Sequence, residues 1–173
     1  NASAVGYGNN ANALAASAVG YNNTAGGVGS STIGYNNTAT NENASAFGYG
    51  NTAGGLASSA FGFSNTASGD NANAFGYNNI ASGSKSNVFG TGNTVSGSSS
   101  TAVGTSNEVA AENSTAIGNN NTISSGAENS AALGNNISIS LKDSVALGNN
   151  STATAINSVT GNSSYTKWAG VSD

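Results

Sequence analysis

Asn43-Ala-Ser-Ala-Phe-Gly-Tyr-Gly-Asn-Thr-Ala-Gly-Gly-Leu56 is the fourteen-residue stretch that decides the fold, because variants of it fill almost the whole chain. Its central Gly48 recurs at a step of 14 from Gly6 to Gly118, then at Gly134 after 16 residues and at Gly148 after 14. These positions define eleven copies. The two extra residues fall within residues 124–129, where we expect one longer turn. A constant period of this length indicates a repeat architecture.

The first part of each copy alternates small and bulky residues. The position two before the glycine is almost always Ala, and the position four before it is always Ala or Ser. Alternation with a period of two predicts a β-strand. The residue directly before the glycine is bulky and apolar in every copy: Val5, Val19, Ile33, Phe47, Phe61, Phe75, Phe89, Val103, Ile117, Leu133 and Leu147.

The second part of each copy holds another apolar position, five residues after the glycine, as in Ala53 or Ile123. Asn stands three residues after the glycine in the first nine copies, from Asn9 to Asn121. Gly, Asn and Ser fill the remaining positions, which is turn chemistry. Each copy therefore has room for two short strands and two turns but not for a helix. We interpret the Asn column as a structural ladder of stacked amides rather than as a ligand site.

One such unit buries no core by itself, so we expect the copies to stack in register as parallel strands around a shared core. Aromatic residues follow the glycine in the first six copies, from Tyr7 to Tyr77, while the second apolar position is Ala. That position grows to Val or Ile as the aromatics end. This is either volume compensation inside the coil or drift between two groups of duplicated repeats.

Two assignments of the strand faces are open, and both require partner chains. In the first, the bulky column from Val5 to Leu147 fills the coil, and the small residues form a flat uncharged stripe that a monomer would expose along its full height. The second places the bulky residues at the interface and the small ones inside. The first assignment predicts an interface made of Ala4, Ala18, Ala46, Ala60, Ala74, Ala102, Ala116, Ala132 and Ala146.

The composition excludes several classes of function. Asn, Ser, Ala, Gly and Thr supply 129 of the 173 residues, and the chain has no Cys, His, Met or Pro. Thiolate and imidazole chemistry is therefore absent, as are zinc sites built from Cys and His. Three Lys and no Arg cannot form the basic surface that nucleic-acid binding requires. We expect no enzyme activity, no metal and no cofactor. No apolar run approaches the roughly 20 residues that span a bilayer.

The repeat resembles the head repeat of trimeric autotransporter adhesins of the YadA-like type, on segments such as Asn43-Ala-Ser-Ala-Phe-Gly48, Ser114-Thr-Ala-Ile-Gly118 and Asp143-Ser-Val-Ala-Leu-Gly148. The resemblance covers residues 1–155. It implies an all-β fold, a left-handed parallel β-roll of about eleven 14-residue coils, assembled as a homotrimer. It also implies display on the bacterial cell surface, at the tip of a stalk that is anchored in the outer membrane. We accordingly expect this chain to be a fragment of a longer protein.

The repeat period fails after Ala155. Ser163-Ser-Tyr-Thr-Lys-Trp-Ala-Gly170 resembles the start of the small connector module that follows such heads, with Trp168 at its aromatic position. The sequence thus predicts a head over residues 1–155 and a truncated connector or neck over residues 156–173. The alternative for this segment is a frayed end.

The leading hypothesis for function is an adhesin head that makes many weak contacts and gains strength from avidity. The resemblance suggests host matrix proteins such as collagen or fibronectin, host receptors or glycans, or other bacterial cells as partners. The alternative is a structural spacer, with binding done by other modules. An ice-binding solenoid is disfavoured, because no Thr column runs through all copies. The candidate ligand-binding residues are turn positions that break the repeat: Glu42, Asp70, Lys85 and Glu112.

Overall fold

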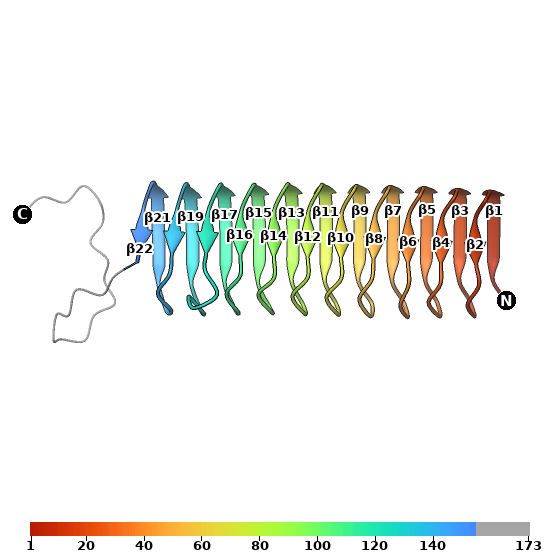
Figure 1. Ribbon diagram of the computed structural model, residues 1–173, viewed down its shortest axis with the longest axis horizontal. Helices are drawn as coiled ribbons and strands as arrows, with labels where there is room; N and C mark the ends of the chain where they lie inside the picture. The colour runs from red at the N-terminus through yellow and green to blue at the C-terminus, as the bar shows by residue number, and fades with distance from the viewer. Residues whose placement is uncertain (155–173) are drawn as a thin grey trace, which may run out of the picture.

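The computed structural model describes residues 1–154, which form a parallel β-solenoid drawn as a straight rod in Figure 1. Each coil contributes one five-residue strand and one two-residue strand. The five-residue strands make the front sheet: β1 (Ser3–Tyr7), β3 (Ser17–Tyr21), β5 (Ser31–Tyr35), β7 (Ser45–Tyr49), β9 (Ser59–Phe63), β11 (Asn73–Tyr77), β13 (Asn87–Thr91), β15 (Thr101–Thr105), β17 (Thr115–Asn119), β19 (Ala131–Asn135) and β21 (Val145–Asn149).

The two-residue strands make the back sheet. They are β2 (Asn10–Ala11), β4 (Thr24–Ala25), β6 (Thr38–Ala39), β8 (Thr52–Ala53), β10 (Thr66–Ala67), β12 (Ile80–Ala81), β14 (Thr94–Val95), β16 (Glu108–Val109), β18 (Thr122–Ile123), β20 (Ser138–Ile139) and β22 (Thr152–Ala153). The eleven coils expected from the sequence are confirmed. The segment predicted as a connector lies outside the described residues.

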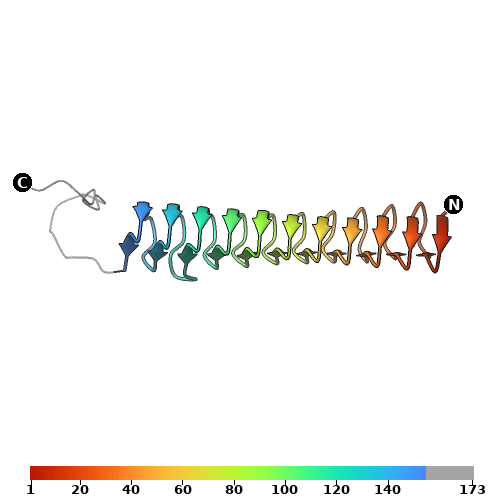
Figure 2. The same ribbon diagram turned by 90° about the horizontal axis from the view of Figure 1, so that it is seen from above.

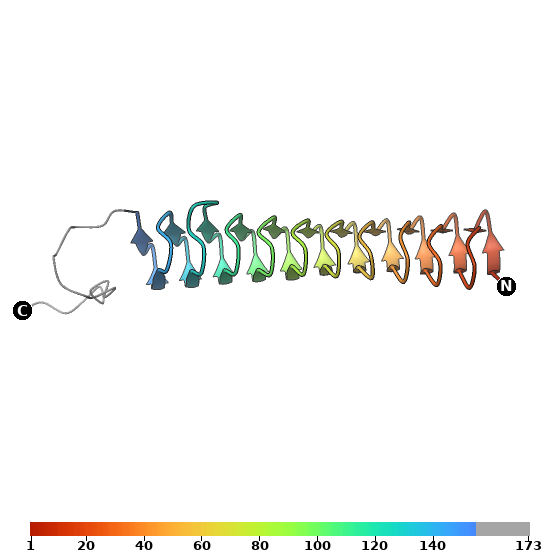
Figure 3. The same ribbon diagram turned by 90° about the horizontal axis from the view of Figure 1, so that it is seen from below.

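Every strand pairs in parallel with its equivalent in the next coil, so identical positions stack along the rod. Gly48 lies opposite Gly62, and Phe47 opposite Phe61. Gly118 pairs with Gly134 although the two are 16 residues apart, because the extra residues leave the strand register unchanged. They lengthen the turn between β18 and β19, as predicted, and this turn bulges from the rod in Figures 2 and 3.

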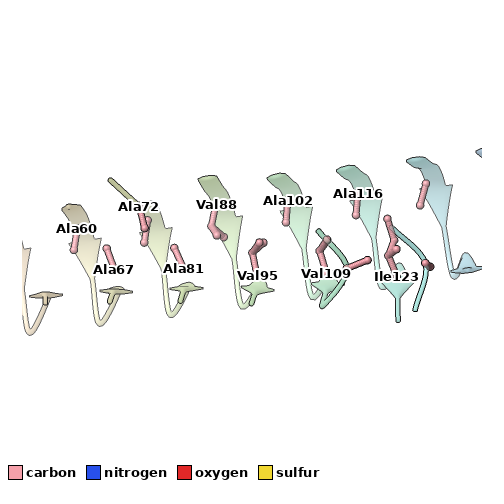
Figure 4. Packing of buried hydrophobic residues seen from close by; sticks show 14 of the residues in the cluster. Ala60, Ala67, Ala72, Ala81, Val88, Val95, Ala102, Val109, Ala116 and Ile123 are labelled. Atoms are coloured by element: carbon pink, nitrogen blue, oxygen red, sulfur yellow. The ribbon is translucent and has the colours of Figure 1, made fainter. Parts of the chain in front are cut away.

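The interior of the coil is filled by small residues, which overturns the assignment of the bulky column to the core. Ala60 of the front sheet faces Ala67 of the back sheet, and Ala116 faces Ile123 (Figure 4). The column predicted to form the interface is buried inside single coils: Ala18, Ala46, Ala60, Ala74, Ala102, Ala116, Ala132 and Ala146 are at most 6% exposed. Its first member, Ala4, is exposed in the terminal coil. The part of the second assignment that places the small residues inside the coil is therefore confirmed.

The physical reason is the thinness of the coil. Two sheets joined by turns of a few residues leave a gap that a pair of small or medium side chains fills, such as Ala60 with Ala67 or Val88 with Val95. A Phe ring has no space there, so the alternation of the strand turns it outward. The aromatic column after the glycine also points outward, as exposed Tyr35 and Tyr49 show. Volume compensation inside the coil is therefore wrong as an explanation of the aromatic pattern.

The Asn column is confirmed as a structural ladder. The backbone N–H and side-chain Nδ2 of Asn51 both donate to Oδ1 of Asn37, each at 3.0 Å. The same Nδ2 also donates to the carbonyl oxygens of Phe47 and Gly62, at 2.9 and 2.7 Å. Each amide thus satisfies buried backbone groups in its own coil and in the next one. The ladder ends where Ile137 donates its backbone N–H to Asn121 Oδ1 at 3.0 Å and buries an aliphatic side chain instead.

The repeated glycine is required by close contact between coils. Gly62 has φ +120°, and a Cβ atom at this position would lie 2.1 Å from the carbonyl oxygen of Gly76. No side chain fits there without moving the backbone. The glycine that marks the period in the sequence is therefore the residue that lets adjacent coils approach to strand-pairing distance.

Candidate interaction surface

The outer face of the front sheet carries three parallel columns of side chains, one from each outward position of its strands. In β7 these are Ser45, Phe47 and Tyr49. Ala46 points inward between the first two, and Gly48, which has no side chain, lies between the last two. Because the strands stack in register, each column continues along the rod as a ladder of equivalent residues. We call this surface the front face.

The middle column of the front face is the bulky apolar column. Phe47, Phe61, Phe75 and Phe89 stack with ring centroids 4.7 to 5.2 Å apart. Ile33 and Leu133 are each 48% exposed, and Val103 is 37% exposed. Val19, Phe47, Phe61 and Phe75 are half-buried, and the other members are exposed. A continuous strip of large apolar side chains that are at least partly accessible therefore runs from one end of the rod to the other. Soluble monomers rarely expose a contiguous apolar patch of this extent.

The third column is an aromatic ladder over the first six coils. Tyr7, Tyr21, Tyr35, Tyr49, Phe63 and Tyr77 stack with ring centroids 4.8 to 5.2 Å apart. All six rings are at least 40% exposed. From β13 onward Thr and then Asn replace them, so the front face is more apolar in its N-terminal half.

Charge is absent from the front face. No outward position of the eleven described front strands is Asp, Glu, Lys or Arg. The charged side chains of residues 1–154 lie in turns or on the back sheet: Glu42, Asp70, Lys85, Glu108, Glu112, Glu128, Lys142 and Asp143. Apolar surface combined with depletion of charge is the composition of an interface core.

The four predicted ligand residues lie on the edge of the rod, in the turns that lead from the back sheet to the next front strand. All four side chains are exposed. Glu42, Asp70 and Glu112 share one position in their coils, and Lys85 lies one residue further on. Asp70 and Lys85 are on adjacent coils, since the Lys85 N–H donates to the Asp70 carbonyl oxygen at 2.8 Å. The structure does not bring Glu42 or Glu112 next to this pair.

Asp70 has a structural contact of its own. Its Oδ1 accepts a hydrogen bond from the backbone N–H of Leu56 at 2.9 Å. This bond joins two adjacent coils and satisfies a turn donor. At least one of the candidate residues therefore contributes to the turn geometry.

The acidic side chains of the described part of the chain do not gather into a cluster. Glu108 is exposed on β16, whereas Glu112 and Glu128 lie in turns. Within residues 1–154, no Asp and Glu side chains are grouped as a metal site. In the same residues, no helix has the length and apolar character needed to cross a membrane.

The first assignment of the strand faces placed the bulky column inside the coil and therefore missed the front face as a candidate interaction surface. Its signal is nevertheless in the sequence, because all three alternating positions of the strand lack charge in every copy. Solvent-facing columns of a repeat rod normally carry some charge for solubility. The short-sheet column at Thr66, Ile80 and Glu108 is of that mixed kind.

The coils and their ladders define a parallel β-solenoid repeat protein, whose long regular faces are suited to contact rather than to catalysis. Comparison with known families specifies the class further. The family described as YadA head domain repeat (2 copies) matches residues 25–51, 53–79, 96–121 and 142–159. The chain belongs to this family, and it is a head domain of the YadA-like, trimeric autotransporter type. A comparison with curated proteins finds no match.

Proposed function

We propose that this chain is the binding head of a surface-displayed adhesin and that three copies associate through their front faces. The observation that carries the proposal is the uncharged, apolar front face that runs the whole length of the rod. Its bulky column, from Val5 to Leu147, meets the equivalent columns of two other copies around a threefold axis. Membership of the family supports the number three, and the exposure of these side chains supports the choice of face.

Association through the front face removes apolar surface from water at little electrostatic cost. Apolar burial stabilises by about 25 cal/mol per Å². A face without charges pays no desolvation penalty for ions. Small Ser residues such as Ser45 and Ser59, half-buried beside the bulky column, let the sheets approach closely. Each coil contributes a similar contact, so the interface grows with the number of coils.

The assembly leaves the back sheets and the turns of all three chains facing outward. The back sheet presents Thr at most coils, as at Thr24, Thr38 and Thr52, and the turns carry the charges. A partner with its own repeats then meets three sets of regularly spaced weak sites, and avidity gives firm attachment. Candidate partners are host matrix proteins such as collagen or fibronectin, host receptors or glycans, and other bacterial cells.

The test is a solid-phase binding screen with the purified fragment against collagen, fibronectin, mucins and bacterial cells. We expect the assembled fragment to bind at least one of these surfaces. The matched control is Phe61→Asp, which places a charge in the front face and leaves the outward turns intact. Its binding should be weaker because avidity is lost. A fragment that assembles but binds none of these surfaces would contradict the adhesin function and favour a spacer.

A further inference from the structure

Asparagines at one corner of the coil lie outside the Asn ladder. This corner is the position two residues after the repeated glycine, where the chain turns from the front strand toward the back strand. Asn36 at this corner is exposed and has φ +59°, and its side-chain amide makes no hydrogen bond to the described residues. The neighbouring ladder residue Asn37 is buried, and its Nδ2 donates to three acceptors. The corner amide can therefore be modified without the loss of a contact that holds the coils together.

A hydroxyl side chain follows most of these corner asparagines at a distance of two residues. The sequence Asn-X-Ser/Thr, with X not Pro, is the acceptor sequence for N-linked sugars. The corner residues that satisfy it are Asn22, Asn36, Asn120, Asn136 and Asn150, followed by Thr24, Thr38, Thr122, Ser138 and Thr152. Asn78 occupies the same corner with φ +55°, but Ile80 stands two residues after it. The chain thus contains its own unmatched site.

The ladder asparagines never form the acceptor sequence, because the residue two positions after each of them is the inward residue of the back strand. Asn37 is followed by Ala39 and Asn121 by Ile123, and both of these side chains are buried. The alternation of the back strand therefore separates the two kinds of asparagine. The acceptor sequence is confined to amides that the fold does not use, and its hydroxyl lies on the outer side of the back sheet.

We propose that Asn22, Asn36 and the equivalent corner asparagines are sites of N-linked glycosylation by an enzyme that uses a nucleotide-activated sugar. The anomeric carbon of the sugar forms a bond to Nδ2 of the asparagine, which loses one proton. The bond from that carbon to the nucleoside diphosphate breaks, and the diphosphate leaves with the oxygen and its electron pair. The enzyme reads the acceptor sequence in the extended chain before the coil closes, so it needs no access to the assembled rod.

The sugars lie away from the surface that the proposed assembly covers. Association uses the outward side chains of the front strands, whereas Asn36 belongs to a turn and Thr38 to the back sheet, which the assembly leaves facing outward. Among the described back strands only β16 carries a charged residue, Glu108. Bulky, hydrated sugars at the corner would keep such weakly charged rods soluble and apart.

The experiment uses the full-length protein purified from the bacterium that produces it, with its peptides analysed by mass spectrometry. Two reciprocal variants are expressed in the same bacterium. Thr38→Ile removes the hydroxyl of the Asn36 site and leaves Asn36 in place, whereas Ile80→Thr supplies a hydroxyl to Asn78. Thr and Ile both occupy this back-sheet column already, so both variants should fold, and circular dichroism checks this.

We expect the wild-type peptides to carry a sugar on Asn22 and Asn36 and none on Asn78. Thr38→Ile should abolish the modification of Asn36, and Ile80→Thr should create one at Asn78. A third variant, Asn36→Gln, separates attachment to the amide from attachment to the Thr38 hydroxyl, because it removes only the former. Unmodified Asn22 and Asn36 in the wild type, a sugar on wild-type Asn78, or a sugar that remains on Thr38 in Asn36→Gln would each overturn the proposal.

Discussion

At the scale of single residues, the coil depends on side chains that satisfy backbone groups of the next coil. The Asn ladder does this with a polar residue in the interior, where an unpaired group is costly. Nδ2 of Asn65 donates to Phe61 O at 3.0 Å and to Gly76 O at 2.8 Å, and its Oδ1 accepts the backbone N–H of Asn79 at 3.0 Å. Asn65 Nδ2 also donates to Asn51 Oδ1 of the preceding coil at 3.0 Å, so the amide links three coils.

Replacing Asn65 by Ala should destabilise the rod. The change leaves two carbonyl groups and one N–H without their partner, at about 1–3 kcal/mol for each buried group that stays unpaired. Thermal denaturation followed by circular dichroism measures the loss. Asn12→Ala is the control, because Asn12 is exposed in a turn. Equal melting temperatures for the two variants would show that the ladder is dispensable.

Gly62→Ala should be severely destabilising. The new Cβ would lie 2.1 Å from Gly76 O, in a backbone conformation that itself costs about 1–3 kcal/mol for a residue with a side chain. Gly126→Ala is the matched control, because a Cβ at Gly126 meets nothing within 4 Å. The same denaturation measurement applies, and a Gly62→Ala variant as stable as Gly126→Ala would disprove the close approach of coils at this position.

At the scale of the strands, the sequence predicts the elements well and the side of each element less well. Both strands of every coil could be predicted from two patterns: the period-two alternation, as around Phe61, and the turn residues between copies. The alternation does not say which set of residues faces in, because a strand has two faces. That choice depends on the distance between the two sheets, which is a property of the closed coil. The turn lengths set that distance, and here it admits Ala60 and rejects Phe61.

Two isoleucines of the back sheet test directly which of its side chains face the core and which face the solvent. Ile123 is buried in β18, whereas Ile80 is 43% exposed on β12. Ile123→Ala should cost about 2–5 kcal/mol, because it leaves a cavity in the core. Ile80→Ala should change stability by less than about 0.5 kcal/mol. A larger loss from Ile80→Ala, measured by the same unfolding experiment, would mean that the back sheet is reversed.

At the scale of the whole molecule, charged and uncharged side chains lie on different surfaces of the rod. The front face is uncharged, and the turns and back sheet carry the charged side chains of the described coils. The family and the repeat could be predicted from the sequence, because one motif appears in eleven copies. The ligand-binding positions could not be predicted, because a surface that binds a ligand can have the same kinds of residues as a surface that contacts only water. Glu42 stands in a variable turn column that also holds Val28, Leu56 and Asp70, so its charge alone does not mark a ligand position.

We expect partner recognition to use the charged turns, because a partner distinguishes one coil from another by the residues that vary. The combined variant Glu42→Gln, Asp70→Asn, Lys85→Gln and Glu112→Gln should assemble normally and adhere less to the surface that the wild-type fragment binds. Solid-phase adhesion measures this, with light scattering as the check on assembly. Undiminished adhesion would shift recognition to the uncharged Asn, Ser and Thr columns.

The most direct test of the account is the molar mass of the fragment in solution, because association of three chains through the front face is its central proposal. Light scattering should give three chains for the wild type and for Thr52→Asp, whose new charge lies on the exposed side of the back sheet. Phe61→Asp should give one chain with an unchanged β-type circular dichroism spectrum. A wild-type mass of one chain, or a Phe61→Asp variant that still contains three, would contradict the account.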